Sequence, residues 1–396
     1  MGRTASARRA TLGTLVMVAA AAALAAVAAG GALAPGAGAR DAHPPAAAVS
    51  AAGSLRNRVF ASGARITHTT PKGSEAISKP DDITSLGGRI YVAFQNGVGP
   101  QGEASTTGNL DSTVVEFGRN GRRLDQWDIV GKCDGLTADP ALGQVIATVN
   151  EDAHSSFYLI RPGGGAVHYR YAAPVASHGG TDAIDIYKGA VMISGSAPGT
   201  TGTAAPQAAY PAVYRANIDQ RTHVARLHAV FSDEARATVA NTSGATHGHS
   251  VRLGLTDPDS NETVPAFAGR FAGDFMLTSQ GDEEQIFLNG AGAHPSLSVL
   301  KLSASVDDTA WPSGPIGTLY VTDNGNDTIN AVTGPFRRGS EIVATTPCDE
   351  STAPTTCPGP GFPANYLGEV NPRSGSITQL TLSGAALEPQ GMLFVP

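Results

Sequence analysis

The chain has 396 residues, of which 15% are charged and 6% aromatic, with 48 glycines and 26 prolines. Its formal charge is −7 at pH 7, which argues against a nucleic-acid or anionic-membrane partner, because either would need a basic face. No long segment after residue 40 repeats apolar residues at helical spacing. These features exclude a helical bundle and predict an all-β fold with many short strands and turns.

The N-terminus has the pattern of an export signal. Arg3, Arg8 and Arg9 form a basic region, residues 12–33 an apolar region, and residues 37–39 a small-residue cleavage site. The Arg8-Arg9 pair also admits twin-arginine export, beside the general secretory route. An uncleaved membrane anchor is the alternative, because the apolar run is long.

We therefore predict a signal peptide over residues 1–39, a flexible linker over residues 40–54, and a secreted or cell-envelope location. Cleavage would remove three arginines and no acid, so the formal charge would fall from −7 to −10. Beyond the possible N-terminal anchor, we expect no contact with a membrane.

Short strands follow one another from residue 58 to the end of the chain. A hairpin turn at Asn120-Gly121 joins two of them, and residues 195–207 and 256–265 are predicted as inserted loops. The predicted strands cover residues 58–60, 65–67, 82–84, 89–94, 113–117, 124–130, 144–149, 157–160, 167–171, 190–194, 212–215, 223–227, 251–255, 274–279, 285–288, 298–302, 318–323, 328–332, 366–370, 377–382 and 392–395.

Six similar segments precede or begin predicted strands, and each carries a polar residue at the same place. The equivalent residues are Asp81, Asp134, Asp182, His249, Asp307 and Gln390. Their intervals of 53, 48, 67, 58 and 83 residues are those of propeller blades stretched by loop insertions.

The two ends of the strand-rich region complement each other. The sixth unit ends after one strand, residues 392–395, and the hairpin of residues 58–60 and 65–67 has no unit of its own. Pairing the two would close a ring and leave no long sheet edge exposed. We predict that residues 55–396 form a monomeric six-bladed β-propeller, closed by pairing of the N- and C-terminal strands.

A second set of polar residues follows the second strand of several units: Gln95, Asn150, Gln280 and Asn324. In an up-and-down blade, the start of the first strand and the end of the second lie on one face. These amides and Gln390 should therefore surround one mouth of the central channel and bind a small molecule or a cell-envelope ligand.

Four of the repeated residues are acids: Asp81, Asp134, Asp182 and Asp307. Carboxylates brought together raise one another's pKa values, and a divalent cation removes the conflict. Oxygen ligands suit Ca²⁺, the cofactor that we predict, or Mg²⁺ and Mn²⁺. The alternative is that these side chains cap strand starts through hydrogen bonds to the backbone.

Three of the openings resemble a known group of six-bladed propellers. They are Pro80-Asp81-Asp82-Ile83, Cys133-Asp134-Gly135-Leu136 and Pro389-Gln390-Gly391-Met392. They resemble NHL-repeat proteins, the SMP-30/gluconolactonase-like lactonases and the streptogramin lyases.

Each relative in that group implies a different function. The lactonase resemblance implies a metal-dependent hydrolase of lactones or esters, in which Asp134 or Asp182 acts as base. The lyase resemblance implies catalysis by His249. Many NHL-type propellers bind ligands without known catalysis, which gives the alternative of a non-catalytic binding propeller in the cell envelope.

The three cysteines divide into a pair and a single residue. Cys348 and Cys357 flank a Pro/Thr-rich stretch and are predicted to form a disulfide in an oxidising compartment. Cys133 is predicted to be a small buried residue at the start of a strand.

Overall fold

The computed structural model describes residues 54–175, 179–197, 209–290, 296–347 and 364–396, all within one compact unit, Ala52–Pro396. These residues form strands, one short 3-10 helix (η1, Gly63–Arg65) and no α-helix, which confirms the all-β prediction. Within these ranges no helix is long and apolar enough to cross a membrane. The predicted signal peptide, linker residues 40–53, Cys348 and Cys357 lie outside the described residues.

The first half of the unit contains three runs of four consecutive strands. One run forms a sheet by itself: β4 (Pro80–Leu86), β5 (Arg89–Phe94), β6 (Asp111–Phe117) and β7 (Arg123–Val130). The next is β8 (Cys133–Asp139), β9 (Gln144–Val149), β10 (Ser156–Ile160) and β11 (Ala166–Tyr171). The third is β12 (Thr181–Tyr187), β13 (Ala190–Gly195), β14 (Pro211–Asp219) and β15 (Val224–Ser232). Parallel pairing of β11 with β15 joins the last two runs into one eight-stranded sheet.

The following sheet corrects one prediction. It contains β16 (Arg236–Val239), β17 (Ser250–Arg252), β18 (Pro258–Thr263), β19 (Phe275–Ser279), β20 (Glu284–Asn289) and β21 (Ser296–Lys301), in the order β17-β16-β21-β20-β19-β18. The first strand was predicted at residues 251–255, followed by a loop, but β18 lies inside that loop. Its acids and amides hide it, because a strand that faces a polar cavity lacks the apolar alternation of a half-buried strand.

The last two sheets are interleaved along the chain. One consists of β22 (Val306–Ala310), β25 (Glu341–Thr345), β26 (Tyr366–Val370) and β27 (Ile377–Gln379). The other has the order β28 (Leu382–Gly384), β1 (Leu55–Ser62), β24 (Thr328–Thr333), β23 (Thr318–Asp323) and β29 (Pro389–Val395). The prediction placed residues 318–332 in the sheet of residue 307 and is wrong, since the β23–β24 hairpin belongs to the neighbouring sheet and β25 was missed.

The N-terminal strands also pair differently from the prediction. Strand β1 pairs antiparallel with β24, and β2 (Thr67–Thr70) pairs with β3 (Gly73–Ala76) instead of with β1. Strands β1 and β29 share a sheet, but β24 and β23 separate them. Direct pairing of the N- and C-terminal strands is therefore wrong, although both ends of the unit enter the same sheet.

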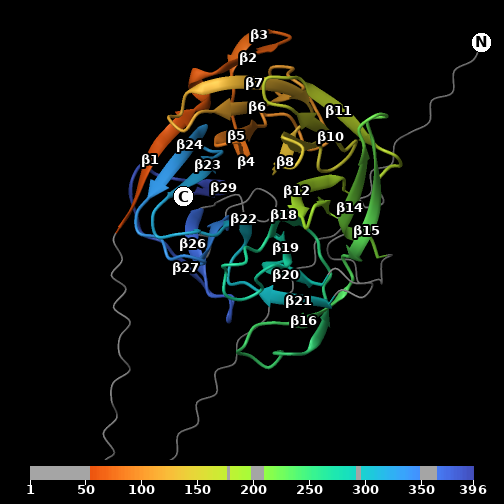
Figure 1. The fold of residues 1–396 in the computed structure, drawn as a ribbon, viewed down its shortest axis with the longest axis vertical. Coiled ribbons are helices and arrows are strands. Elements are labelled where there is room, and N and C mark those ends of the chain that lie inside the picture. Colours follow the sequence, from red (N-terminus) through yellow and green to blue (C-terminus); the bar gives the residue numbers. More distant parts are fainter. Residues whose placement is uncertain (1–53, 176–178, 198–208, 291–295, 348–363) are drawn as a thin grey trace, which may run out of the picture. The chain divides into compact units, whose positions relative to one another are not determined.

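Six strands, here called the inner strands, lie next to the centre of the unit: β4, β8, β12, β18, β22 and β29 (Figure 1). Each packs against the next in this order, and β29 packs against β4. Gly391 of β29 shows how close the last contact is, since a Cβ atom there would lie 2.3 Å from the Asp81 carbonyl oxygen. This arrangement of sheets around a common centre is that of a β-propeller.

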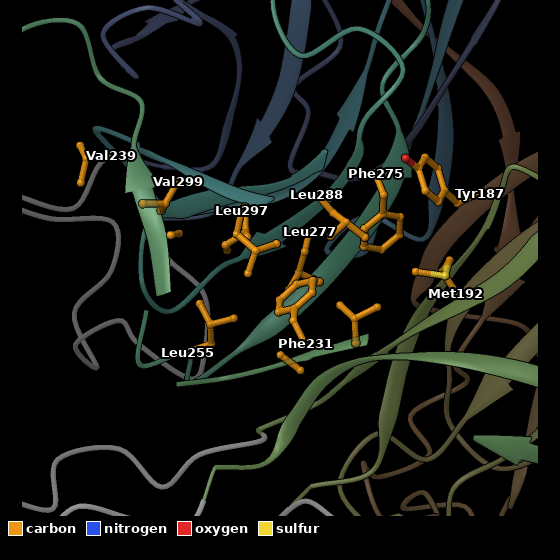
Figure 2. Packing of buried hydrophobic residues seen from close by; sticks show 14 residues of the cluster. Tyr187, Met192, Phe231, Val239, Leu255, Phe275, Leu277, Leu288, Leu297 and Val299 are labelled. Carbon is orange, nitrogen blue, oxygen red and sulfur yellow. The ribbon is translucent and has the colours of Figure 1, made fainter. Parts of the chain in front are cut away.

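The strand that pairs with each inner strand supplies apolar side chains to both faces of its sheet. In β5, Tyr91 and Ala93 pack toward the sheet of β8, whereas Ile90, Val92 and Phe94 pack toward the sheet of β23. Figure 2 shows the equivalent packing between β12–β15 and β16–β21, with Phe275 and Leu277 of β19 at its centre. Successive side chains of a strand point to opposite faces, so a strand between two sheets must be apolar throughout.

Glu341, the first residue of β25, is a buried acid away from the centre of the unit. It is 6% exposed, and its Oε1 atom has no hydrogen-bond partner. Burial raises the pKa of Glu341 from 4.5 to about 7, while a hydrogen bond from Gln285 opposes the rise. Between pH 4.5 and 7, Glu341 therefore keeps its proton in the native state but loses it in the unfolded chain. The stability that comes from this bound proton is complete below pH 4.5 and is lost as the pH rises through 7.

Replacing Glu341 by Gln should remove this dependence. Relative to the wild type, the Glu341→Gln variant should gain about 3 kcal/mol in its free energy of unfolding between pH 4.5 and pH 8. Chemical denaturation at both pH values measures this difference. The exposed control Glu283→Gln should show no such gain, and an equal response of both variants would contradict the prediction.

Candidate functional site

The N-terminal ends of the inner strands surround a cavity of about 1170 Å³, here called the mouth. This volume is somewhat above the usual range for small-molecule sites. Thirteen of the described residues that line it are Asp or Glu, two are Lys, and none is His or Arg. The site is therefore strongly acidic.

The second residue of each inner strand lies in the mouth, and we call this place the ring position. It is occupied by Asp81, Asp134, Asp182, Asp259, Asp307 and Gln390. Around these residues the strand pairing shifts register in all six strands, as in a β-bulge. A bulge bends the strand and re-aims its side chains, which explains why polar side chains from six strands meet in one cavity.

The sequence predicted five of these six ring residues, and the exception is instructive. His249 precedes β17 at the outer edge of its sheet and is exposed, so its placement at the ring is wrong. The true equivalent is Asp259 of β18. Its segment begins Pro258-Asp259, as Pro80-Asp81 and Pro389-Gln390 do, and this Pro-polar pair is the signal that could have found it.

The amides that follow the second strands have different positions. Gln95, 6% exposed, donates a hydrogen bond from Nε2 to Asp134 Oδ1 at 2.9 Å. Gln280 donates from Nε2 to Thr346 Oγ1 at 2.8 Å and to Asp307 Oδ1 at 3.4 Å. Asn324 also lines the mouth. These contacts make Gln95 and Gln280 groups that orient ring carboxylates.

Asn150 lies outside the lining of the mouth. Its Oδ1 atom accepts a hydrogen bond from the Lys132 backbone N–H at 3.0 Å. Its backbone has a φ of 66°, in the left-handed region that Asn tolerates better than most residues. Asn150 therefore shapes the loop after β9, beside Lys132, whose side chain supplies the main cation of the mouth.

Lys132 is the main cation of the mouth. Its side chain is 18% exposed, and Nζ lies 2.7 Å from Asp134 Oδ1 and also contacts Glu151 Oε1. Burial acts to lower the pKa of Lys132, but the carboxylates of Asp134, Glu151 and Asp81 together raise it well above its ordinary value. Lys132 is thus a permanent positive charge on one side of the mouth.

Burial and mutual repulsion raise the pKa values of the ring acids. Burial raises the pKa of Asp81 from 3.8 to about 7, although Lys132 opposes the rise. Burial raises the pKa of Asp134 and Asp182 well above the ordinary range, again with Lys132 opposing. The pKa of Asp259 is also raised by burial, and its strongest charged neighbours are all acids. Among the described residues, the charged groups that act most strongly on Asp259 therefore provide no positive compensation.

In two inner strands the residue after the ring position is also an aspartate, and it stabilises the fold through hydrogen bonds to the backbone. Asp82 accepts hydrogen bonds from the backbone N–H of Ile83 at 2.6 Å and of Leu136, on the next inner strand, at 2.5 Å. Asp308 accepts in the same way from Thr309 at 2.6 Å and from Met392 of β29. The strand-capping alternative considered for the ring acids thus describes these two aspartates.

Two buried threonines tie the inner strands together below the ring. Thr322 of β23 donates a hydrogen bond to the Asp81 carbonyl oxygen at 2.5 Å and contacts that of Gly391 at 3.2 Å. In the same way, the Thr148 hydroxyl of β9 contacts the carbonyl oxygens of Asp182 at 2.5 Å and Gly135 at 3.2 Å. Hydroxyl groups on second strands therefore fix the spacing of the strands that carry the ring aspartates.

A metal was predicted at Asp81, Asp134, Asp182 and Asp307, all of which line the mouth. Among the described residues, no group of three or more His, Cys, Asp or Glu side chains is already arranged to hold a metal ion. However, the Asp134 Oδ2 and Ser260 Oγ atoms are buried without a hydrogen-bond partner. Unsatisfied buried oxygens of this kind fit the preferences of a hard cation such as Ca²⁺.

Cys133 begins β8 and is 0% exposed, with a free thiol. Burial raises its pKa well above the ordinary value, and the carboxylates of Asp134 and Asp82 add to the rise. The thiol is therefore inert packing, as predicted.

No protein-family model matches the chain, and no curated protein sequence matches it. Solved structures to which it is similar include the periplasmic gluconolactonase of Pseudomonas aeruginosa, at 11% identity and a TM-score of 0.45, covering 87% of this chain and 99% of that one. A luciferin-regenerating enzyme has 12% identity and a TM-score of 0.36, covering 67% and 81%. The β-propeller domain of Cps50 from Myceliophteria thermophila has 13% identity and a TM-score of 0.35, covering 69% and 80%. The neighbours thus include the gluconolactonase group that the strand openings resemble.

The threonine contacts predict a measurable loss of stability. Replacing Thr322 by Val keeps the shape but leaves two buried carbonyl oxygens without their hydroxyl donor, so the free energy of unfolding should fall by about 1–2 kcal/mol. The exposed control Thr378→Val on β27 should be nearly neutral. Denaturation at one pH measures both, and equal stability of the two variants would contradict the proposed strand tie.

Proposed function

We propose that the unit Ala52–Pro396 is a six-bladed propeller. Its support is the succession of six inner strands that returns from β29 to β4. In this interpretation the last blade combines β29, β23 and β24 with β1, so the two ends of the unit complete one blade. The ring is then closed by strands from both ends without their direct pairing.

Deletion of residues 391–396 tests this closure. It removes most of β29, exposes the edge of β23 and leaves a gap beside β4, so the variant should aggregate or melt at a much lower temperature. Deletion of residues 40–54 is the control and should have no comparable effect. A C-terminally truncated protein that melts like the full-length chain would overturn the six-bladed interpretation.

We propose that the protein is exported and that its mouth binds a divalent cation, with Ca²⁺ as the first candidate. The observation that carries the proposal is the convergence of five ring aspartates in one acidic cavity, where Lys132 is the cation that contacts them among the described residues. We assign Asp259, Asp307 and Asp182 as the ligands, because Asp307 and Asp182 are the acids that act most strongly on Asp259, and no basic group is among its strongest charged neighbours. Asp81 and Asp134 lie on the Lys132 side.

We propose hydrolysis of lactone- or ester-like small molecules as the activity, the substrate class that the strand openings suggest. A divalent cation, when bound, would polarise the carbonyl and make a water molecule more acidic. Asp134 or Asp182 would accept the proton of that water. Gln95 holds the Asp134 carboxylate in place through its 2.9 Å hydrogen bond. Gln390 and Asn324 line the mouth where the rest of the substrate would contact the protein.

A non-catalytic binding propeller of the cell envelope is the second candidate. It is favoured by the finding that no group of three acid side chains in the described residues is already arranged around a metal position. The lyase alternative has less support, because no histidine is among the described residues that line the mouth. His249, the histidine that the lyase resemblance implies, is exposed.

Cation binding should be visible in thermal unfolding. A ligand that binds the native state raises its stability by mass action, so added Ca²⁺, Mg²⁺ or Mn²⁺ should raise the melting temperature of the mature protein. Asp182→Asn keeps the size of the side chain but removes a charge, and it should lose most of that rise. Asp219→Asn, at an exposed position outside the mouth, is the control and should keep it. A wild-type melting temperature that does not change with any divalent ion would contradict the metal site.

The activity itself is tested with a panel of lactones and esters, in the presence and absence of chelator. Turnover that is lost with chelator and restored by the metal would support the hydrolase. Binding without turnover would support the second candidate.

A further inference from the structure

The two lysines of the mouth are placed very differently. Lys132 is mostly buried, and its ammonium contacts Asp134 and Glu151. Lys79 is exposed at the rim, and it forms no salt bridge with any described residue. One lysine is therefore built into the acidic cavity, and the other is exposed to solvent.

Only one of the two oxygens of the Asp134 carboxylate, which Lys132 contacts, has a hydrogen-bond partner. The Asp134 side chain is 6% exposed, and its Oδ1 atom contacts both Lys132 and Gln95. Its Oδ2 atom is buried and has no hydrogen-bond partner. A buried carboxylate oxygen without a partner is costly, so this atom marks a place where a donor or a cation would be stabilised.

The surroundings of Asp259, on the inner strand β18, are different. Asp259 lies near Asp307, Asp182 and Asp257, and no basic group is among its strongest charged neighbours. Among the described residues, Lys132 thus contacts Asp134 directly, whereas the charged groups that act most strongly on Asp259 are all acids.

We propose that Lys132 is a built-in counter-ion that fills one of two cation positions in the mouth. Its ammonium occupies the position beside Asp134 and Glu151, and the position beside Asp182, Asp259 and Asp307 remains for a bound ion. The second part rests on the proposed cation-binding function, whereas the first rests on the contacts of Lys132 alone. Lys132 would then set the number and the place of the ions that the mouth accepts.

Removing the ammonium should create a new ion site. In Lys132→Met, Asp134 and Glu151 lose the ammonium, while Asp134 Oδ1 keeps its hydrogen bond from Gln95 and Oδ2 remains without a partner. Isothermal titration with Ca²⁺ alone, together with native mass spectrometry, should show one ion for the wild type and two for the variant. Lys132→Gln, which retains a hydrogen-bond donor, provides a second variant if the methionine substitution impairs folding, and it should also bind two ions.

Two matched variants separate this role from a general change of charge. Lys79→Met removes the same charge from the same cavity and should leave the count at one ion. Lys132→Met combined with Asp134→Asn removes both partners of the internal ion pair and should also bind one ion. A second ion in Lys79→Met would overturn the inference, because any loss of positive charge would then suffice.

The possible counts distinguish this inference from the proposed function. One ion in both the wild type and the Lys132 variants, with equal affinity, would overturn the counter-ion role and leave the cation-binding function intact. No ion in the wild type and one in the Lys132 variants would support the counter-ion role and overturn divalent binding by the native mouth. No ion in either would overturn both.

Discussion

The mouth gathers more buried carboxylates than its own lysines can neutralise, and the central part of the structure is arranged around this imbalance. Taking a carboxylate out of water disfavours its charged form, and neighbouring carboxylates add to the effect. Four of the ring acids therefore have raised pKa values, and Asp134 among them accepts a hydrogen bond from Gln95 and contacts Lys132. A cavity of this kind attracts cations and repels phosphorylated or carboxylated molecules.

The backbone makes such crowding possible. Register shifts near the start of all six inner strands turn the ring residues into the mouth, and four nearby polar residues hold adjacent strands together. Asp82 and Asp308 do so through backbone N–H groups, and Thr148 and Thr322 through carbonyl oxygens. On β4 and β22, a ring aspartate and an aspartate that holds two inner strands together are thus adjacent in the chain. Their partners distinguish them, because residue type alone does not.

The interleaving of the last two sheets is a second feature with a physical consequence. The chain leaves β22, forms the β23–β24 hairpin in the neighbouring sheet, and then returns to complete its first sheet with β25–β27. Apolar side chains from β22, β23, β25 and β29 pack in one cluster between these sheets. Neither sheet is complete without segments that lie on both sides of the other in the sequence, so the two should fold and unfold together.

The sequence by itself determined the β class, most strand positions and five of the six ring residues. Apolar runs such as residues 89–94 and 144–149 predict strands well, because strands buried on both faces must be apolar throughout. The recurrence of Pro-Asp or Asp-Gly before an aliphatic residue marked the inner strands, since the same turn into the mouth needs similar residues each time.

Tertiary structure alone decided what local pattern cannot encode. Strand β18 was hidden because a cavity-facing strand has no alternation of its own, so Asp259 was replaced by His249 in the prediction. The placement of β23 and β24 depends on which sheet edge is free when the hairpin forms, and pairing between distant segments leaves little trace in a single sequence. The pairing of Lys132 with Asp134 and Glu151 depends on the same long-range packing. Adjacent residues in the chain show charge and size, but only the folded chain shows which charges are buried together and which are left without a partner.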